Sequence, residues 1–221
     1  MKSSIARKVA MALSAFFLMF FLLQHFAINI TAVFSPETFN DISYFMGTNP
    51  VVQYALQPVL LFGVIFHFVM GFILELKNKS ARGGVKYVKY AGGANASWMS
   101  RNMIWSGLAI LGFMIFHFND FWIPEIVDKF VEGNSQEGKD YYHHVVTMFE
   151  NPIRVGVYAL SFVFLALHLL HGFNSAFQSA GANNKFTRGG LQKFGTIYAI
   201  SIPLGFIFIA VYLHLAHAGA H

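Results

Sequence analysis

Histidine is the residue type that offers chemistry in the apolar parts of this 221-residue chain. Four of the ten histidines stand well inside long apolar stretches, namely His25, His67, His117 and His168. An ionisable side chain in such surroundings is costly to desolvate and by default suggests a function. A neutral imidazole nitrogen is a good metal ligand, although a single buried histidine can equally serve a hydrogen bond between helices. The chain has no cysteine, so any redox metal that it binds must depend on histidine.

These histidines must be held by helices that cross a membrane. Apolar residues make up 56% of the chain and charged residues only 11%, against about 25% in a soluble domain, which excludes an ordinary soluble enzyme. A hydrocarbon layer of about 30 Å takes about 20 helical residues, and five stretches are long enough: about 9–32, 51–76, 102–122, 153–180 and 191–216. Runs that are apolar on every side exclude the alternating strands of a membrane barrel. The sequence therefore predicts an all-α fold, a single membrane domain over residues 1–221 with five transmembrane helices.

Lysine and arginine are distributed unequally between the connections. The N-terminal segment and the connections between the second and third and between the fourth and fifth helices carry 12 of the 15 basic residues and one acid, Glu75. This excess of positive charge predicts that the N-terminus lies in the cytoplasm and the C-terminus outside. The basic residues also favour contact with anionic membrane lipid. No nucleic-acid partner is expected, because these residues flank membrane helices.

The four histidines fall at two depths. At about 1.5 Å per residue, His25 and His117 lie about 24 Å from the inner ends of the first and third helices. His67 and His168 lie about 24 and 22 Å from the outer ends of the second and fourth helices, and so in the inner half. Two neutral imidazoles from facing helices are what six-coordinate haem b requires. The sequence thus predicts two haem b groups, an outer one on His25 and His117 and an inner one on His67 and His168.

Two glycines follow the inner histidines at the same spacing. Gly71 and Gly172 stand one helical turn after His67 and His168, where the lack of a side chain would let a flat macrocycle approach the backbone. Close helix packing is the alternative reason for a glycine there. His171 is a rival ligand in the fourth helix, but the shared His-x-x-x-Gly pattern favours His168.

Matching spacings suggest that the first and second pairs of helices are repeats. Ser14 and Ser106 each precede an outer histidine by 11 residues. Asn-Pro pairs at 49–50 and 151–152 stand at the expected starts of the second and fourth helices, where the missing N–H of proline goes unused. Membrane proteins built from repeats commonly bind ligands between the halves, although short matches in apolar sequence also arise by chance.

Short motifs along the whole chain complete the pattern. Gln24-His25 lies in the first helix, Ser100-Arg101-Asn102 opens the third, and Gly172-Phe173-x-Ser175-Ala176-Phe177 closes the fourth. Together with the four histidines, these motifs resemble the single-chain dihaem cytochrome b anchor of succinate dehydrogenase and fumarate reductase. The resemblance implies a proximal haem on the second and fourth helices and a distal haem on the first and third.

The same resemblance implies partners and a place in the cell. It implies a bacterial cytoplasmic membrane, with a flavoprotein subunit that carries covalent FAD and an iron–sulfur subunit on the cytoplasmic face. It also implies electron transfer between the iron–sulfur subunit and a quinone, usually menaquinone. Some fumarate reductases of this family carry a glutamate two residues before the fourth-helix ligand, where it is thought to move protons. Ala166 stands at that position here, so this proton pathway is not expected.

Further residues are candidates for contacts with the cofactors. Haem propionates need hydrogen-bond donors, for which the candidates are Ser14, Ser106, Trp98, Arg101 and Trp105. Asn29 and Asp120 could hydrogen-bond a quinone, or could simply be wet at the interface. The remaining histidines are expected to be solvated, with proton exchange or a metal site as alternatives: His143, His144, His214, His217 and His221.

Two other functions fit parts of the pattern. The dihaem cytochrome of a hydrogenase or formate dehydrogenase also passes electrons to quinone, and the subunits that copurify would distinguish it. A transporter with a histidine proton relay belongs to another class. We expect no buried carboxylate in the spans, Glu75 being at an inner end, which disfavours the transporter.

Overall fold

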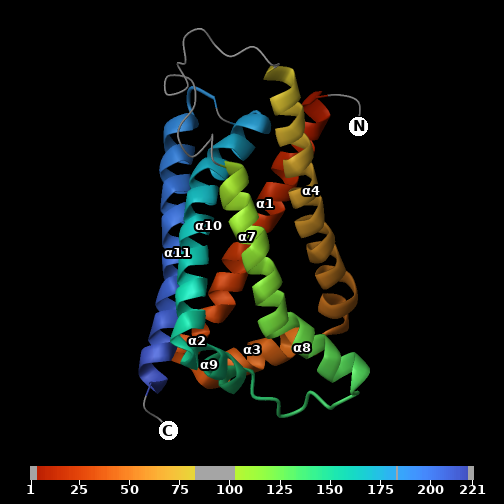
Figure 1. The fold of residues 1–221 in the computed structure, drawn as a ribbon, viewed down its shortest axis with the longest axis vertical. Helices are drawn as coiled ribbons and strands as arrows, with labels where there is room; N and C mark the ends of the chain where they lie inside the picture. The colour runs from red at the N-terminus through yellow and green to blue at the C-terminus, as the bar shows by residue number, and fades with distance from the viewer. Residues whose placement is uncertain (1–3, 83–102, 183, 219–221) are drawn as a thin grey trace.

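The computed structural model describes residues 4–82, 103–182 and 184–218, which form an all-α bundle. Among these residues, five helical segments are long and apolar enough to cross a membrane, which confirms the predicted fold class: Ile5–Phe34, Val52–Ser80, Met103–Val131, Pro152–Ser179 and Arg188–His217. The chain is therefore a multi-pass membrane protein (Figure 1). Trp98 and Arg101, two of the expected propionate donors, lie outside the described residues, as does His221.

The helices divide into two halves and a final helix. The first half comprises α1 (Ser4–Asn29), α2 (Thr31–Phe34), α3 (Pro36–Thr48), the π-helix η1 (Val52–Leu56) and α4 (Gln57–Arg82). The second half comprises α7 (Met103–His117), the π-helix η2 (Phe118–Trp122), α8 (Ile123–Ile126), the π-helix η3 (Val127–Val131), α9 (Tyr141–Glu150) and α10 (Pro152–Ser179). The final helix is α11 (Arg188–His217).

The third span is longer than the sequence predicts. Its apolar stretch predicts an end near residue 122, but helical backbone continues through η2, α8 and η3 to Val131. An ion pair one turn apart, between Lys129 and Glu125, supports this polar continuation. Asp120 consequently lies inside the span and is only 3% exposed. The expectation that the spans hold no buried carboxylate is therefore wrong.

Four long helices surround the centre of the bundle as a ring. α1 packs against α4 and α10, and α7 also packs against α4 and α10. In Figure 1, α7 lies in front of α1, with α10 and α4 on either side. α1 and α7 are therefore diagonal to each other across the ring, as are α4 and α10. α11 lies outside the ring against α10 and α1, where the hydroxyl of Tyr198 donates to the carbonyl of Met19 at 2.5 Å.

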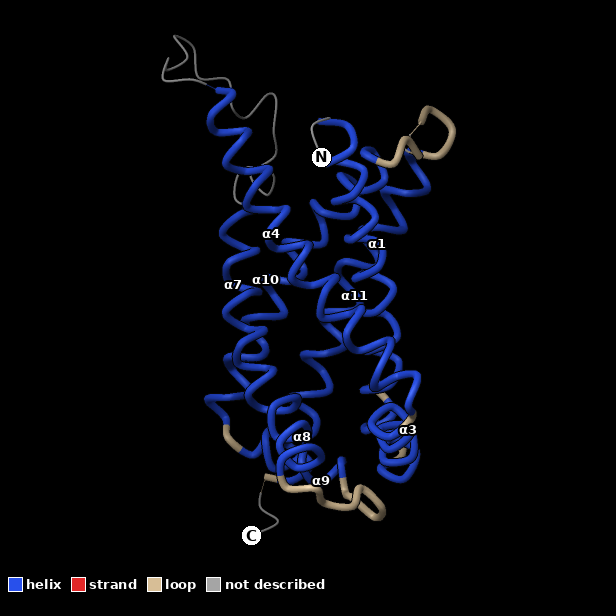
Figure 2. The backbone as a smooth tube through the Cα atoms, turned by 90° about the vertical axis from the view of Figure 1, so that its right-hand side faces the viewer, coloured by secondary structure: helices blue, strands red, loops and turns tan. Residues whose placement is uncertain are grey.

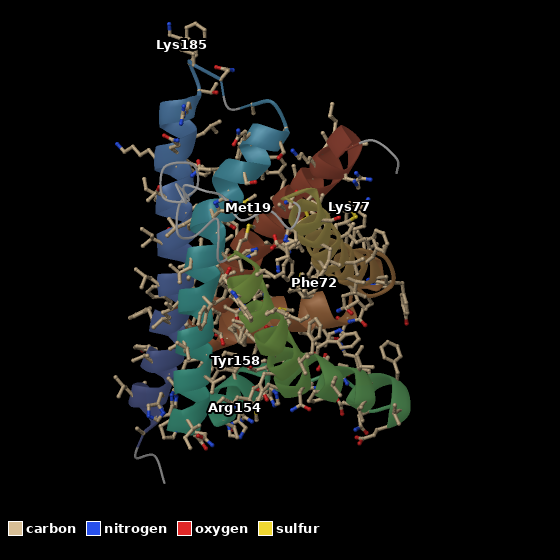
Figure 3. All side chains as sticks on the ribbon, turned by 45° about the horizontal axis from the view of Figure 1, so that its top comes forward. Met19, Phe72, Lys77, Arg154, Tyr158 and Lys185 are labelled. Carbon is tan, nitrogen blue, oxygen red and sulfur yellow. The ribbon has the colours of Figure 1, made fainter. Side chains whose placement is uncertain are left out.

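The two ends of the bundle differ in charge. One end, which we call the basic end, holds the start of α1, the end of α4 and the α10–α11 connection, with Lys77, Lys185 and Arg188. The acidic end holds α3, α8 and α9 (Figure 2), with acids such as Asp128. Figure 3 shows Lys77 and Lys185 towards one end of the molecule and Arg154 towards the other.

Two short helices that the apolar pattern did not predict, α3 and α9, contact each other at the acidic end. The side chains of Ser35 and Asp140 cap their first turns. Asn40 of α3 joins them, because its amide donates to the Asp140 carboxylate at 3.0 Å and its oxygen accepts from the Tyr142 backbone at 2.7 Å. These bonds hold α3 and α9 together beneath the ring.

The two halves follow the same order of a long helix, a short helix, an Asn-Pro pair and a second long helix. Asn49 and Asn151 each accept, with Oδ1, hydrogen bonds of 2.9 and 3.3 Å from the backbone N–H groups two and three residues later. The equal cap geometry agrees with the repeat that the spacings suggest. Both long helices of one half run in the same directions as those of the other, so the two halves have a parallel arrangement.

Candidate functional site

A continuous cavity of about 1560 Å³ lies between the four helices of the ring. All four span histidines line it, from α1, α4, α7 and α10. Most other lining residues are phenylalanine, leucine, isoleucine, valine and methionine. A pocket for one small ligand typically has about 300–1,000 Å³, so this cavity has room for more than one such group.

The histidine pair nearer the basic end consists of His67 on α4 and His168 on α10, two diagonal helices. Their ring centroids are 6.3 Å apart, with an angle of 69° between the rings. The Oγ of Ser14 lies 3.1 Å from Nδ1 of His67, and the Oγ of Ser106 lies 3.2 Å from Nδ1 of His168. Each histidine is thus backed by a serine from the neighbouring helix of its own half. His171 also lines the cavity, but the ring that faces His67 is that of His168.

The pair nearer the acidic end consists of His25 on α1 and His117 on α7, the other two diagonal helices. Their ring centroids are 5.9 Å apart at 81°. Aromatic rings surround the pair, with centroids 5.3–5.7 Å from one histidine or the other: Phe21, Phe113, Phe121 and Phe206. Nδ1 of His117 is buried and has no hydrogen-bond partner among the described residues. Buried polar atoms without a partner are uncommon in protein interiors, which distinguishes this nitrogen from Nδ1 of His67 and of His168.

Both pairs have the separation that opposed ligation of one metal ion requires. A bond between a metal and an imidazole nitrogen is about 2.0 Å, and the ring centre lies about 1.1 Å further, so two opposed imidazoles have centroids about 6.2 Å apart. The observed separations are 6.3 and 5.9 Å. On α1, Ser14 beside the pair nearer the basic end stands 11 residues before His25 of the other pair. On α7, Ser106 stands 11 residues before His117, and 11 residues span about 16 Å along a helix. The donors therefore fit two haem groups at separate levels.

Gly71 and Gly172 line the cavity beside a methionine from the neighbouring helix. A Cβ at Gly71 would meet the Met11 Cε at 3.7 Å, and a Cβ at Gly172 would meet the Met103 Cε at 3.8 Å, which are ordinary contacts. Helix packing therefore does not by itself require glycine at either position. The contrast is Gly195 of α11, where a Cβ would overlap the ring of Phe173.

The two residues proposed for quinone contact lie in different surroundings. Asn29 lines the cavity, and its amide donates to the carbonyl of His25 at 2.8 Å. The buried Asp120 carboxylate accepts from the Tyr158 hydroxyl at 2.8 Å and pairs with Nε of Arg154 at 3.3 Å. The Asp120 carboxylate is therefore bonded within the protein and is not solvated. A quinone that contacts it would have to compete with Tyr158 and Arg154.

Other expected site residues lie away from the span histidines. Trp105, a candidate propionate donor, is 67% exposed on the outside of the bundle. His144 hydrogen-bonds the carbonyl of Asp120 at 2.9 Å, and His214 the carbonyl of Phe149 at 2.8 Å, so these two are not simply solvated. Within the described ranges, no group of three or more histidines, cysteines or acids could hold a metal ion.

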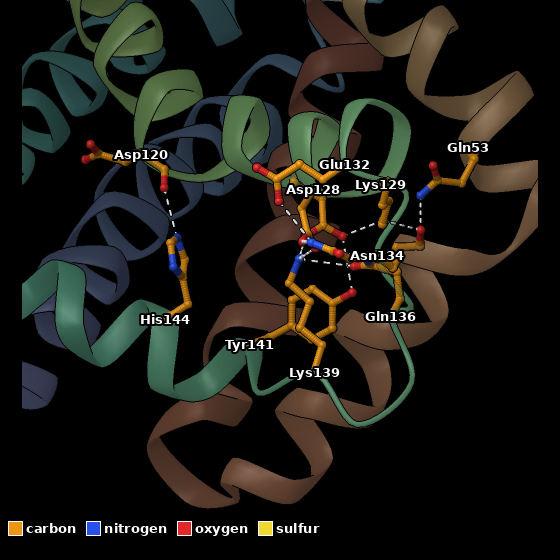
Figure 4. A network of polar contacts seen from close by, with 12 residues as sticks. Gln53, Asp120, Asp128, Lys129, Glu132, Asn134, Gln136, Lys139, Tyr141 and His144 are labelled. Atoms are coloured by element: carbon orange, nitrogen blue, oxygen red, sulfur yellow. Dashed lines mark hydrogen bonds and ion pairs between the residues drawn. The ribbon is translucent and has the colours of Figure 1, made fainter.

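An ion network that sequence reasoning missed borders the cavity at the acidic end (Figure 4). Lys139 Nζ pairs with Glu125 at 2.7 Å and with Asp128 at 2.5 Å, and the Tyr141 hydroxyl donates to Glu125 at 3.2 Å. Burial lowers the pKa of Lys139, but these carboxylates raise it more, so the pKa lies above its usual range. Burial and the nearby Glu125 raise the pKa of Tyr141. The residues paired in these three contacts are 11–16 positions apart in sequence, so local spacing offered no signal for them.

The fold and the cavity define a multi-pass helical membrane protein with paired histidines at two levels. Comparison of the chain with protein-family models, with curated proteins and with solved structures finds no match.

Proposed function

We propose that the chain is a dihaem cytochrome b, the membrane anchor of a succinate dehydrogenase or fumarate reductase complex. One observation carries the haem part of this proposal. The four span histidines form two facing pairs on diagonal helices, with ring centroids 5.9 and 6.3 Å apart, and each pair could hold one haem. Bound at these two levels, haem would supply one-electron transfer across the membrane.

The residues of the chain would hold and tune that chemistry. His67 with His168, and His25 with His117, would each hold one haem through their ring nitrogens. The apolar and aromatic lining would exclude water, which lowers the local polarity and influences the potential of a bound haem. The protein would thus determine which residues hold each haem, how far apart the two haems are and how polar their surroundings are, while the redox chemistry belongs to the cofactor.

The assignment to succinate and fumarate depends on the motif resemblance described above. In this proposal the basic end faces the cytoplasm, in agreement with the excess of lysine and arginine there. The flavoprotein subunit with FAD and the iron–sulfur subunit would bind at that end. Menaquinone would exchange electrons near the pair His25 and His117, where Asn29 lines the cavity.

Two rival functions remain distinguishable from this one. A dihaem anchor of a hydrogenase or formate dehydrogenase would show the same haems but copurify with other subunits. The buried Asp120 removes the argument from sequence against a proton-coupled transporter, which was that the spans hold no buried carboxylate. Its pairing with Arg154 and Tyr158 favours a structural role, because the carboxylate is already satisfied within the protein.

The haem content and spectrum of the purified chain test the proposal. We expect two low-spin haem b groups per chain. His67→Ala and His168→Ala should each remove the same one of the two signals, and His25→Ala and His117→Ala should both remove the other. His143→Ala, at an exposed position of α9, is the matched control and should preserve both signals. A wild-type chain without haem, or His25→Ala and His67→Ala removing the same signal, would overturn the proposal.

A further inference from the structure

Ser14 and Ser106 occupy equivalent positions behind the pair nearer the basic end. Ser14 is on α1 and approaches His67 of the adjacent α4, while Ser106 is on α7 and approaches His168 of the adjacent α10. Both serines are buried, at 9% and 8% exposure. The sequence suggests propionate contacts for them, but each hydroxyl is within hydrogen-bond distance of a histidine ring nitrogen.

Each serine also has a second partner, which fixes the direction of its hydrogen bonds. Ser14 Oγ donates to the carbonyl of Met11 at 2.8 Å, and Ser106 Oγ donates to the carbonyl of Met103 at 2.9 Å. A hydroxyl has one hydrogen to donate and two lone pairs. Because that hydrogen is used on the backbone, the oxygen accepts from Nδ1–H of the histidine.

This direction determines the tautomer of both histidines. A neutral imidazole carries one hydrogen, so a hydrogen on Nδ1 leaves Nε2 with a free lone pair. That is the form of the ring that can bind a metal ion through Nε2. The two serines thus present His67 and His168 to each other in the ligating form.

The pair nearer the acidic end lacks this device. Nδ1 of His117 has no hydrogen-bond partner among the described residues, and Nδ1 of His25 lies 3.4 Å from the amide nitrogen of Asn29, which is a donor. The Met-x-x-Ser spacing occurs in both halves of the chain, at Met11 and at Met103, so the two serines stand in the same local arrangement. The two levels therefore differ in what stands behind their ligands.

We propose that Ser14 and Ser106 are positioning residues for the metal ligands His67 and His168. They fix the Nδ1–H tautomer and the ring orientation, and by accepting the Nδ1 hydrogen they increase electron donation from Nε2. This inference rests on the proposed haem function. A stronger donor favours oxidised iron, so the serines hold the potential of that one haem below the value it would have without them.

A redox titration of the full-length chain in detergent, followed optically, tests this role. Ser14→Ala and Ser106→Ala should each raise the midpoint potential of one haem and leave the other unchanged. The haem affected should be the one that His67→Ala removes. Ser14→Thr keeps the hydroxyl and should restore the wild-type potential. Ser161→Ala is the matched control, because this half-buried serine of α10 donates to the carbonyl of Val157 in its own helix, and it should change neither potential.

The outcomes separate this inference from the proposed function. A wild-type chain with two haems whose potentials do not move in Ser14→Ala and Ser106→Ala overturns the positioning role and leaves the dihaem assignment intact. A shift in the haem held by His25 and His117 also overturns it. If Ser14→Ala loses one haem completely, Ser14→Thr must restore it at the wild-type potential, and failure to do so assigns the serine to helix packing instead. A wild-type chain without haem overturns both.

Discussion

Replacing Arg154 by methionine should destabilise the protein, because it removes the cation beside a buried carboxylate. The side chain of Asp120 is 2% exposed and that of Arg154 is 27% exposed. In Arg154→Met, the carboxylate keeps the 2.8 Å hydrogen bond from Tyr158 but loses its contact with the guanidinium. Methionine retains an apolar stem of similar length, so the change mainly removes charge.

The expected magnitude follows from the burial of the pair. Removing one partner of a buried ion pair costs about 3–5 kcal/mol. The lower end applies here, because Arg154 is partly exposed and Tyr158 still donates to the carboxylate. We therefore expect the free energy of unfolding to fall by about 3 kcal/mol. In a chain of this size, about 1 kcal/mol corresponds to about 2–4 °C, so Tm should fall by about 6–12 °C.

Thermal unfolding in detergent, followed by circular dichroism, measures this effect. The double variant Asp120→Asn with Arg154→Met removes the charge as well as its partner, and should recover at least half of the lost stability. Arg188→Met, at the exposed start of α11, is the control and should stay within about 0.5 kcal/mol of the wild type. Arg154→Met within about 1 kcal/mol of the wild type, or a double variant no more stable than the single one, would refute the argument.

Three further predictions concern packing, topology and a helix cap. Gly195→Ala should lower the free energy of unfolding by about 1–3 kcal/mol, and Tm with it, because the new Cβ overpacks against Phe173. Gly156→Ala should leave Tm unchanged, because nothing lies within 4 Å of its Cβ. A reporter fused after Arg82 should be active only as a cytoplasmic fusion, and external activity would reverse the proposed orientation. Hydrogen bonds from the His143 N–H and the Asn40 amide lower the pKa of Asp140. The stability that these bonds contribute is therefore present above the ordinary carboxyl pKa and is lost as pH falls through the folded pKa. Asp140→Ala should lower the free energy of unfolding by about 1 kcal/mol at neutral pH and by little in acid.

The fold class could be predicted from sequence because it depends on local composition. Stretches of about 20 apolar residues determine where the chain crosses a membrane, whatever their neighbours are. The rise per residue likewise places His25 and His117 at one level and His67 and His168 at another. The structure brings together the same two pairs. Their role as haem ligands stays a prediction.

Several features depend on packing between distant residues and could not be predicted in this way. The end of the third span near residue 122 was wrong, because ion pairs such as that between Lys129 and Glu125 satisfy charges that a hydropathy pattern counts as a loop. The burial of Asp120 likewise depends on Arg154 and Tyr158, which come from a different helix. A sequence pattern reports the polarity of a residue, but only the folded chain supplies its partner.

The number of spans, their apolar character and the depth of each histidine could be predicted from the sequence, since each of these depends on one helix at a time. The folded bundle alone shows which helices lie diagonally across the ring and which lie side by side. That choice makes His67 and His168 face each other, and it turns Ser14 and Ser106 towards these histidines. The physical reason is that helix packing depends on the shapes of whole side-chain surfaces, which a periodicity along one helix does not describe.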